Sequence, residues 1–371
     1  MAAEARTQLR GRPPTMKVLW TSSSRFVAAL ACAAAIATGC GTAASPPHAG
    51  TPVQTESPPD TASLPNTGVP LVIRPAAVTA GTHVWVSVAV ATLWTSSTAP
   101  RSIDAPALAA PVRIRAWLSA MSTTTRRGLV GRVETQALYG DPLTVIGVSG
   151  SWLHVVAPGQ RTHRDSRGYP GWVPRRQVTT HVPAKTTYVA TVTRLTTWLR
   201  TVSGARAIEI SLGTRLPVLS YTSTAARVAT PTGATLVVSR SDAVLRWPRS
   251  AALALTRTAL VATAKRFLGV PYLWGGRSGF AVDCSGLTGL VYGQDGVRLP
   301  RDTDDQSRVG TAVGLTRRAG DLAFYGPRTS PTHVAMYVSA TQLIHAPAAG
   351  RPVQLVSAGA MAKPVTVRRL F

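Results

Sequence analysis

The chain has 371 residues, a net charge of +25, 28 prolines and three cysteines. Three cysteines exclude a disulfide-rich framework, and the charge predicts an anionic partner. The arginines are scattered and form no nucleic-acid-binding motif. The sequence therefore favours the anionic cell envelope over nucleic acid as that partner.

The N-terminal segment has the form of an export signal. An apolar run of eleven residues, FVAALACAAAI, follows Lys17 and Arg25; it is too short to span a bilayer and is typical of a signal peptide. The residues ATGCGT around Cys40 resemble a bacterial lipobox, which implies that residues 1–40 are a signal peptide ending at a lipidated cysteine. The expected protein is exported and attached to the membrane only through lipid. The alternative is an ordinary cleaved signal peptide and secretion to the cell envelope.

Residues 41–74 predict a disordered tether, because proline, serine and threonine dominate and no apolar period appears. If the segment before Cys40 is removed, Cys284 is the one thiol free to react. An exported protein that keeps an unpaired cysteine exposes it to oxidation, since export normally favours disulfides. This suggests that the thiol of Cys284 is used.

The sequence from residue 75 to residue 248 predicts two small β modules. Within 75–182, residues 111–121 have apolar residues at helical spacing after a proline and predict a short helix. The runs LTVIGV, SWLHVV and GWVP then alternate with Gly- and Pro-containing turns, which is the spacing of a small antiparallel barrel. Residues 183–248 contain further β-rich runs and predict a second barrel, although it lacks the Gly-Trp pair of the first.

Residues 249–371 predict a different, α+β architecture. A helical pattern ends at Gly269, and a glycine-rich turn leads to a second helix that begins at or just after Cys284. Two β runs follow, THVAMYVS and QLIHAPA. A hairpin turn centred near Ser339 would bring His333 and His345 side by side on adjacent strands.

This arrangement predicts a nucleophilic site. A cysteine at a helix N-terminus is expected to have a lowered thiol pKa, because the free amides and the helix dipole favour the thiolate. Cys284 would be the nucleophile, His333 the general base and then the general acid, and His345 the group that orients His333. The alternatives are a structural cysteine with structural strand histidines, or a zinc site formed by these three residues. The usual closely paired zinc ligands are missing.

Several segments together resemble the NlpC/P60 family of cell-wall cysteine peptidases. They are PYLWGGRSGFAVDCSGLTGLVY, LPRDTDDQ, AGDLAFYG, THVAMYVS and LIHAP. The resemblance implies a papain-like core, a Cys–His–His triad on Cys284, His333 and His345, and no cofactor or metal. It implies peptidoglycan stem peptides or muropeptides as substrate, cut between D-glutamate and the diamino acid.

The upstream half is similar to the subgroup of this family with two N-terminal SH3-like modules. These are γ-D-glutamyl-diamino acid endopeptidases that act on peptides with a free N-terminal L-alanine. The resemblance implies that the first module closes one end of the cleft, and that carboxylates pair there with the substrate ammonium group. It implies eight substrate-binding residues: Glu134, Tyr169, Tyr272, Trp274, Asp283, Ser285, Arg301 and Asp302. For each of them, the alternative is a purely structural role.

Two further functions remain open at this point. One is a non-catalytic wall-binding lipoprotein that keeps the fold as a scaffold, which the presence of Cys284, His333 and His345 disfavours. The other is an amidase or acyltransferase, because water and an acceptor amine would use the same thiol chemistry.

Overall fold

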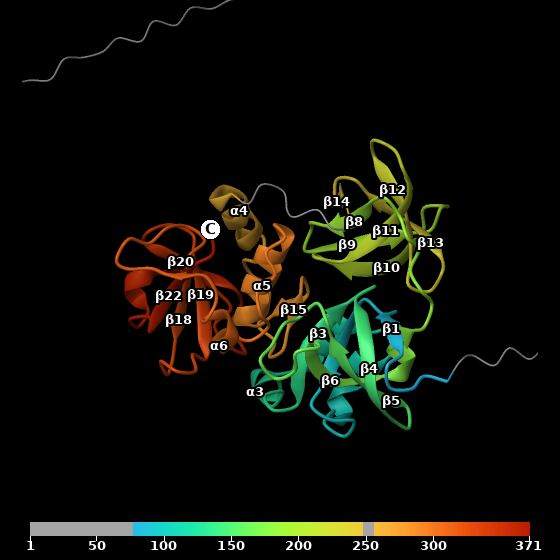
Figure 1. The fold of residues 1–371 in the computed structure, drawn as a ribbon, viewed down its shortest axis with the longest axis horizontal. Helices are drawn as coiled ribbons and strands as arrows, with labels where there is room; N and C mark the ends of the chain where they lie inside the picture. Colours follow the sequence, from blue (N-terminus) through green and yellow to red (C-terminus); the bar gives the residue numbers. More distant parts are fainter. Residues whose placement is uncertain (1–76, 248–255) are drawn as a thin grey trace, which may run out of the picture. The chain divides into compact units, whose positions relative to one another are not determined.

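The computed structural model describes residues 77–247 and 256–371. The predicted signal peptide, Cys40 and nearly all of the predicted tether lie outside these residues. Below, residues 77–182 are called the first module, 183–247 the second module and 256–371 the C-terminal part (Figure 1). Among the helices in these ranges, none has both the length and the apolar character needed to cross a membrane.

The first module is a seven-stranded antiparallel sheet with the strand order β3-β2-β6-β5-β4-β1-β7. A helical segment is inserted between β2 and β3, and the predicted helix lies in this segment. It covers Ile114–Ala120, shorter than the expected 111–121, because Arg113 is still non-helical. The elements are β1 (His83–Val86), β2 (Val90–Trp94), η1 (Ser102–Asp104), α1 (Ala105–Leu108), α2 (Ile114–Ala120), α3 (Thr123–Arg127), β3 (Val133–Leu138), β4 (Pro142–Ser149), β5 (Trp152–Ala157), β6 (Tyr169–Pro174), η2 (Arg175–Gln177) and β7 (Val178–Thr179).

The second module repeats this plan with seven antiparallel strands in the order β10-β9-β13-β12-β11-β8-β14. Its strands are β8 (Val189–Val192), β9 (Thr196–Arg200), β10 (Arg206–Ser211), β11 (Arg215–Tyr221), β12 (Ala225–Ala229), β13 (Thr235–Ser239) and β14 (Ala243–Arg246). In both modules the strand order has two ends, and no pairing between the described strands joins them. The β-rich modules are therefore confirmed, whereas the predicted closed barrels are not. The predicted boundaries at 182 and 248 stay predictions.

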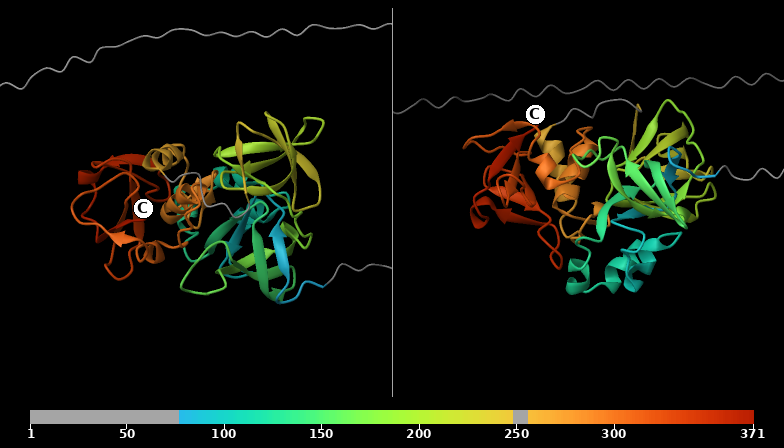
Figure 2. Two further views of the ribbon diagram at one scale, coloured as in Figure 1. Left: turned by 45° about the horizontal axis from the view of Figure 1, so that its top comes forward. Right: turned by 60° about the horizontal axis from the view of Figure 1, so that its bottom comes forward.

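The C-terminal part combines helices with a six-stranded sheet of order β17-β22-β18-β19-β20-β21, which is the predicted α+β arrangement. Figure 1 and Figure 2 show α4 and α5 side by side next to this sheet. The elements are α4 (Arg257–Lys265), β15 (Arg277–Ser278), β16 (Ala281–Val282), α5 (Cys284–Gln294), α6 (Thr303–Gln306), β17 (Thr311–Ala312), β18 (Leu322–Tyr325), β19 (His333–Tyr337), β20 (Gln342–His345), β21 (Gln354–Ser357), η3 (Ala358–Ala360) and β22 (Thr366–Arg369).

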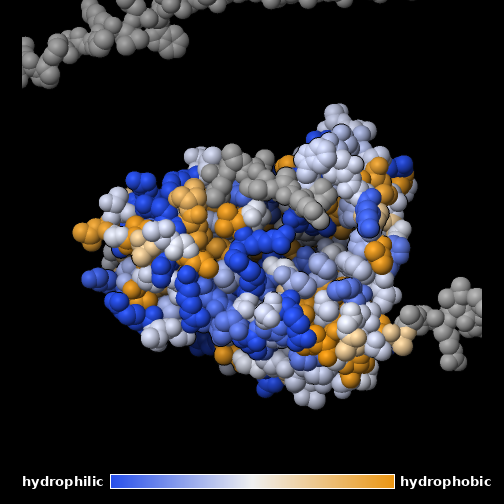
Figure 3. Space-filling model, in the orientation of Figure 1, coloured by the Kyte–Doolittle hydropathy of each residue, from blue (hydrophilic) through white to orange (hydrophobic). Residues whose placement is uncertain are grey.

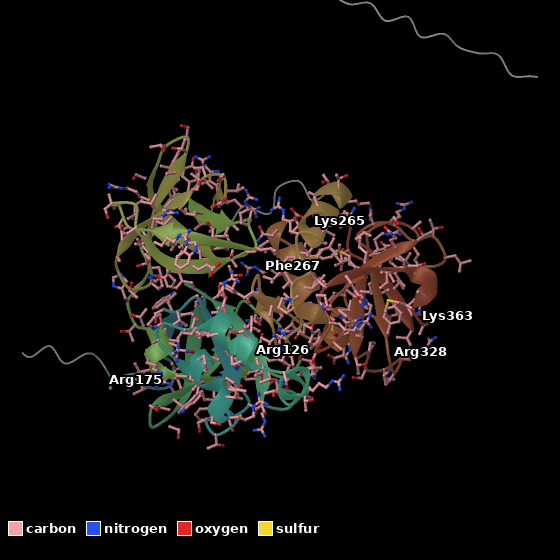
Figure 4. All side chains as sticks on the ribbon, turned by 180° about the vertical axis from the view of Figure 1, so that it is seen from behind. Arg126, Arg175, Lys265, Phe267, Arg328 and Lys363 are labelled. Carbon is pink, nitrogen blue, oxygen red and sulfur yellow. The ribbon has the colours of Figure 1, made fainter. Side chains whose placement is uncertain are left out.

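The helix that carries the cysteine is fixed to the sheet by apolar packing. Leu287, Leu290 and Val291 of α5 are buried in the same cluster as Val334 of β19, and Phe267, which follows α4 and is labelled in Figure 4, is fully buried there. Burying such side chains stabilises the fold by about 1.5–3 kcal/mol each. The position of the N-terminus of α5 is thus set by the core beneath it.

The same core continues into both modules. It includes Trp94, Trp117 and Val133 of the first module and Leu212 of the second. The indole Nε1 of Trp117 donates to the buried carboxylate of Asp104 at 2.8 Å, which satisfies a polar group that burial would otherwise leave unpaired. The first module therefore packs on the C-terminal part through apolar contacts, and its strands reach the region around Cys284.

Candidate active site

Cys284 is the first residue of α5, and Asp283 caps this helix. Asp283 Oδ1 accepts a hydrogen bond from the Gly286 amide at 2.6 Å, and Oδ2 accepts one from the Gly275 amide at 3.0 Å. A capping carboxylate satisfies amides that have no partner within the helix. The Cys284 side chain is 7% exposed. The predicted placement of the cysteine at a helix N-terminus is confirmed.

The expected lowering of the Cys284 pKa is wrong. Burial raises the pKa of the thiol, and the negative charge of Asp283 adds to this effect. The Thr303 hydroxyl, which lies 3.5 Å from Cys284 Sγ, and the backbone of Ser285 and Val334 favour the thiolate, but they do not outweigh burial. The resting site therefore holds a protonated thiol, which needs a base before it can attack.

His333 and His345 lie on the adjacent strands β19 and β20, with His333 Nε2 3.0 Å from His345 Nδ1. The register pairs Met336 with Ile344, so the hairpin is centred one residue after the expected Ser339. The two histidines are therefore diagonal and not directly opposite, a relationship that still lets long side chains meet. Gln354 of β21 contacts the other side of His345: its side-chain amide nitrogen lies 3.3 Å from His345 Nε2.

Both imidazoles are neutral at neutral pH. Burial is the main cause that lowers the pKa of His333 to about 4, and the nearby His345 is the second. Burial and the charge of Arg351 lower the pKa of His345. A neutral His333 can accept a proton, and Val334, the next residue along β19, is one of the groups whose backbone favours the Cys284 thiolate. The helix and the hairpin thus bring thiol and imidazole into the same site.

Three of the eight residues expected in the pocket bind one another. Arg301 is 4% exposed, and its guanidinium donates to Asp283 Oδ2 at 2.7 Å and to Ser285 Oγ at 2.9 Å. Its Nε donates to the Thr135 hydroxyl of the first module at 2.7 Å. In this arrangement Asp283 neutralises Arg301 and caps α5, so its carboxylate is already paired. These contacts agree with a structural role for Asp283, which is the alternative to substrate binding.

The first module provides Glu134, Tyr169 and a residue that the sequence did not suggest, Arg164. The Arg164 guanidinium donates to both Glu134 oxygens, at 2.5 and 2.9 Å, and to the Tyr169 hydroxyl at 3.1 Å. The Tyr169 hydroxyl in turn donates to Asp302 Oδ2 of the C-terminal part at 2.8 Å. The first module and the C-terminal part thus meet in a small acidic cluster, to which the guanidinium of Arg164 is bound.

The loop that carries Arg164 is fixed to the C-terminal part by the residues just before Arg164. The Arg161 carbonyl accepts from the Arg301 amide at 2.8 Å. His163 contacts Asp305 through its backbone amide at 3.0 Å and through Nδ1 at 2.9 Å. Burial raises the pKa of the Asp302 carboxyl, although Arg301 and the Tyr169 hydroxyl oppose this shift.

Tyr272 and Trp274 lie in the turn before α5, and the first module packs on this turn. Trp274 Nε1 donates to the Val133 carbonyl at 3.0 Å, while its ring stays 39% exposed. Gly275 has a φ of +73°, and a Cβ there would lie 2.4 Å from Val133 Cγ1. Tyr272 is 9% exposed, and burial, together with the neighbouring Cys284 and Asp283, raises its hydroxyl pKa. Arg126 of α3, labelled in Figure 4, donates to the Tyr272 carbonyl at 3.5 Å.

Sequence reasoning missed Thr303, Gln354, Arg164 and Thr135. Thr303 lies within the segment LPRDTDDQ, next to Asp302, so the signal was present but was not recognised. The other three are polar residues on separate strands or loops, and only tertiary pairing brings them to the site. Within the two described ranges, the group with metal-ligand geometry is His163, Asp304 and Asp305, and not the cysteine and histidines.

Comparison with known proteins adds independent information. A model described as the NlpC/P60 family matches residues 269–369, and a model described as the YKFC SH3b2 domain matches residues 192–245. The second match supports the module that lacks the Gly-Trp pair. The predicted resemblance is confirmed for both regions.

Relatives that cover most of the chain give the same result. A gamma-D-glutamyl-L-lysine dipeptidyl-peptidase of Bacillus cereus is 36% identical over 288 residues, which are 73% of this chain and 85% of the relative. The protein of the same name in Bacillus subtilis is 34% identical, covering 74% of this chain and 93% of the relative. The crystal structure of an NlpC/P60 family protein from Bacillus cereus superimposes with a TM-score of 0.74 at 34% identity, covering 77% of this chain and 99% of that chain. Because these relatives are more than 30% identical and the chain covers more than two thirds of each, the chain belongs to the NlpC/P60 family, in the subgroup with SH3-like modules.

Proposed function

We propose that this protein is a cysteine peptidase that hydrolyses peptidoglycan stem peptides at the bond between D-glutamate and the diamino acid. The preferred substrates are peptides with a free N-terminal L-alanine. The observation that carries the proposal is the position of Cys284 at the start of α5, against the backbone of Val334. Val334 directly follows His333, which contacts His345, and the acidic end built by the first module lies nearby. The similarity to two gamma-D-glutamyl-L-lysine dipeptidyl-peptidases over most of the chain supports the substrate class.

In the proposed mechanism, neutral His333 removes the proton of Cys284, and the thiolate attacks the γ-carbonyl carbon of D-glutamate. The tetrahedral intermediate collapses to a thioester, and His333 gives the proton to the leaving amine of the diamino acid. Water, activated by His333, then hydrolyses the thioester and restores the thiol. The hydroxyl of Thr303 stabilises the thiolate by hydrogen bonding.

The base role of His333 requires a particular order of protons. If His333 Nε2 donates to His345 Nδ1, the other nitrogen of His333 is left to accept the thiol proton. His345 then carries its proton on Nε2. This order requires the Gln354 amide to be turned so that its oxygen accepts that proton, because in the structure the amide nitrogen lies 3.3 Å from His345 Nε2. His345 and Gln354 are positioning residues in this proposal, because they act on the tautomer and orientation of His333.

The substrate amine is proposed to bind at the acidic end formed by Glu134, Tyr169 and Asp302. An ammonium group there takes the place of Arg164 on Glu134, with Tyr272 and Trp274 along the peptide. Asp283, Ser285 and Arg301 hold the turn and the helix N-terminus in this proposal. A muramyl group attached to the amine would remove the positive charge and meet the first module.

The experiment uses a defined stem tetrapeptide with a free N-terminal L-alanine and the same peptide with an acetylated amine, with products identified by mass. The proposal requires a released L-Ala-D-Glu dipeptide and a kcat/KM ratio of at least about tenfold in favour of the free amine. If an added amine acceptor is incorporated at the glutamyl carbonyl in place of water, the enzyme is an acyltransferase. No turnover of either peptide would favour the non-catalytic scaffold.

We further propose that the protein is exported and anchored through a lipid on Cys40, in contact with the anionic cell envelope. The apolar run before Cys40 and the positive net charge support this location. Cys40→Ala is expected to move the protein from the membrane fraction to the soluble fraction or to leave an uncleaved precursor. Wild-type protein found only in the soluble fraction would contradict the lipid anchor.

A further inference from the structure

A cavity lies where the first module, the second module and the C-terminal part meet. Its volume is about 420 Å³, within the usual range for small-molecule sites. The surface in Figure 3 is hollowed over the middle of the face shown, and hydrophilic residues gather around the hollow. Neither Cys284 nor the two histidines line this cavity. It is therefore separate from the peptidase site.

The cavity lining is strongly basic. Four arginines line it, one from each of β11, β14 and β15 and one from the loop after α5: Arg215, Arg246, Arg277 and Arg298. The one carboxylate among the lining residues is Asp141, whose Oδ2 lies 3.8 Å from a guanidinium nitrogen of Arg277. The lining thus carries an excess of three positive charges.

Burial and repulsion between the arginines both disfavour the charged form of these side chains. Burial lowers the pKa of Arg246 and of Arg277, and burial together with the charge of Arg298 lowers the pKa of Arg215. Asp141 offsets part of this for Arg277 and Arg215, and Asp295, which lies outside the lining, does so for Arg246. Even with Asp295 counted, the positive charges outnumber the carboxylates by two. Arg246 and Arg277 are half-buried, whereas Arg215 and Arg298 are exposed. The lining is therefore a partly buried basic surface, which a bound anion would stabilise.

Unpaired polar atoms in the lining point to a missing ligand as well. Thr191 is 3% exposed and Gln294 is 5% exposed. Within the described parts of the chain, Thr191 Oγ1, Gln294 Oε1 and Arg246 Nε are buried without a hydrogen-bond partner. Buried polar groups are normally satisfied. A hydroxyl and an Nε–H can both donate to an anion, and the Gln294 oxygen can accept from a hydroxyl or a protonated oxygen of the same ligand.

We propose that this cavity binds a small, multiply charged oxyanion of the phosphate type. Guanidinium groups bind such oxyanions in a bidentate manner. Phosphate groups carry up to two negative charges and three acceptor oxygens each, so they suit several guanidinium groups better than a single carboxylate does. Because the four arginines and the unpaired polar groups come from the second module and the C-terminal part, a bound anion stabilises the contact between these two parts.

The test is titration of the purified full-length protein with pyrophosphate, followed by calorimetry and by the thermal unfolding midpoint. We expect saturable binding and a rise in the midpoint. Citrate and inorganic phosphate are the comparison anions. Tighter binding of pyrophosphate than of citrate supports a phosphorylated ligand. Equal or tighter binding of citrate overturns that assignment, and no saturable binding of any of the three overturns the site.

Two exposed lining residues allow a variant that keeps the fold. Arg215→Gln combined with Arg298→Gln should weaken pyrophosphate binding by at least about tenfold. Arg227→Gln is the matched control, because Arg227 is an exposed arginine of β12 outside the cavity. Without added anion, the double variant should unfold at the same or a higher temperature than the wild type, since repulsion has been relieved. Equal losses of binding in the double variant and the control would show a non-specific charge effect and overturn the proposal.

Discussion

Arg164 pairs with Glu134 through two hydrogen bonds, at 2.5 and 2.9 Å, within the same module. The guanidinium also lies over the ring of Tyr169, with its carbon 5.2 Å from the ring centre. A positive group of the chain therefore occupies the position that we propose for the substrate ammonium. Substrate binding must displace Arg164, and the affinity for the amine is reduced by the strength of this internal pair.

Arg164→Ala is expected to lower KM for the free-amine tetrapeptide by about two- to fivefold, with little change in kcat. The pair is partly exposed, so its loss corresponds to no more than about 1 kcal/mol. Arg167→Ala is the matched control, because Arg167 lies on the same loop and pairs with Asp165 outside the pocket. Steady-state kinetics measure the effect. A higher KM in Arg164→Ala would mean that Arg164 contacts the substrate directly.

Glu134→Gln should act in the opposite direction. The amide keeps the size of the side chain but loses the charge that attracts the ammonium group. We expect kcat/KM for the free-amine peptide to fall at least tenfold, while the acetylated peptide is affected less than twofold. The ratio of the two kcat/KM values is the readout. An unchanged ratio would remove Glu134 from substrate recognition and leave the nucleophile assignment intact.

Cys284→Ala should abolish hydrolysis without loss of the fold, because a small side chain replaces another small side chain at the start of α5. Cys284→Ser should retain almost no activity, since a hydroxyl is far less acidic than a thiol. Thermal unfolding of both variants is the control for folding. Activity close to wild type in either purified variant contradicts the proposed role of Cys284.

The pH dependence follows from the direction of the histidine shifts. His333 must be neutral to act as base, and its pKa is lowered to about 4 from the usual 6.5. The acid limb of kcat/KM should therefore lie well below pH 6. A limb between pH 6 and 7 would indicate an ordinary imidazole and contradict the buried arrangement.

The lowered pKa of His333 should also make the free energy of unfolding depend on pH. Between pH 6.5 and about 4 the unfolded chain binds a proton at His333 that the folded chain does not bind. Its contribution to stability is thus present above pH 6.5 and is lost as the pH falls through this window. His333→Ala should flatten this part of the curve of unfolding free energy against pH.

Arg301→Ala should destabilise the protein by about 3–5 kcal/mol, because it leaves the buried carboxylate of Asp283 without its cation. Arg194→Ala is the comparison, since Arg194 forms an exposed pair with Asp242 at 3.2 Å and should cost less than about 1 kcal/mol. Denaturant unfolding measures both. A similar small effect of the two changes would mean that water compensates Asp283 in the variant.

The sequence predicted the local features of the site, but it did not predict the features that depend on tertiary packing. Cys284 at a helix start and two histidines on one hairpin follow from apolar periodicity and turn residues. The thiol pKa was predicted in the wrong direction, because burial depends on how the sheet and the first module pack on α5. The pairing of Arg301 with Asp283, and of Arg164 with Glu134, depends on loops whose positions no periodicity specifies. The hairpin register was missed by one residue, because the turn at residues 339–341 has no strong sequence preference.

The contact between Val133 and Gly275 has a consequence for exchanging parts between relatives. Because Val133 Cγ1 fills the space where a side chain at residue 275 would lie, and the Val133 carbonyl binds the Trp274 indole, the surface of one module shapes the turn that precedes the nucleophile. A chimaera with the first module of another peptidase will keep catalytic rate only if it brings a strand of the same shape at this point. Exchange of the first module is therefore expected to change substrate selectivity and catalytic rate together.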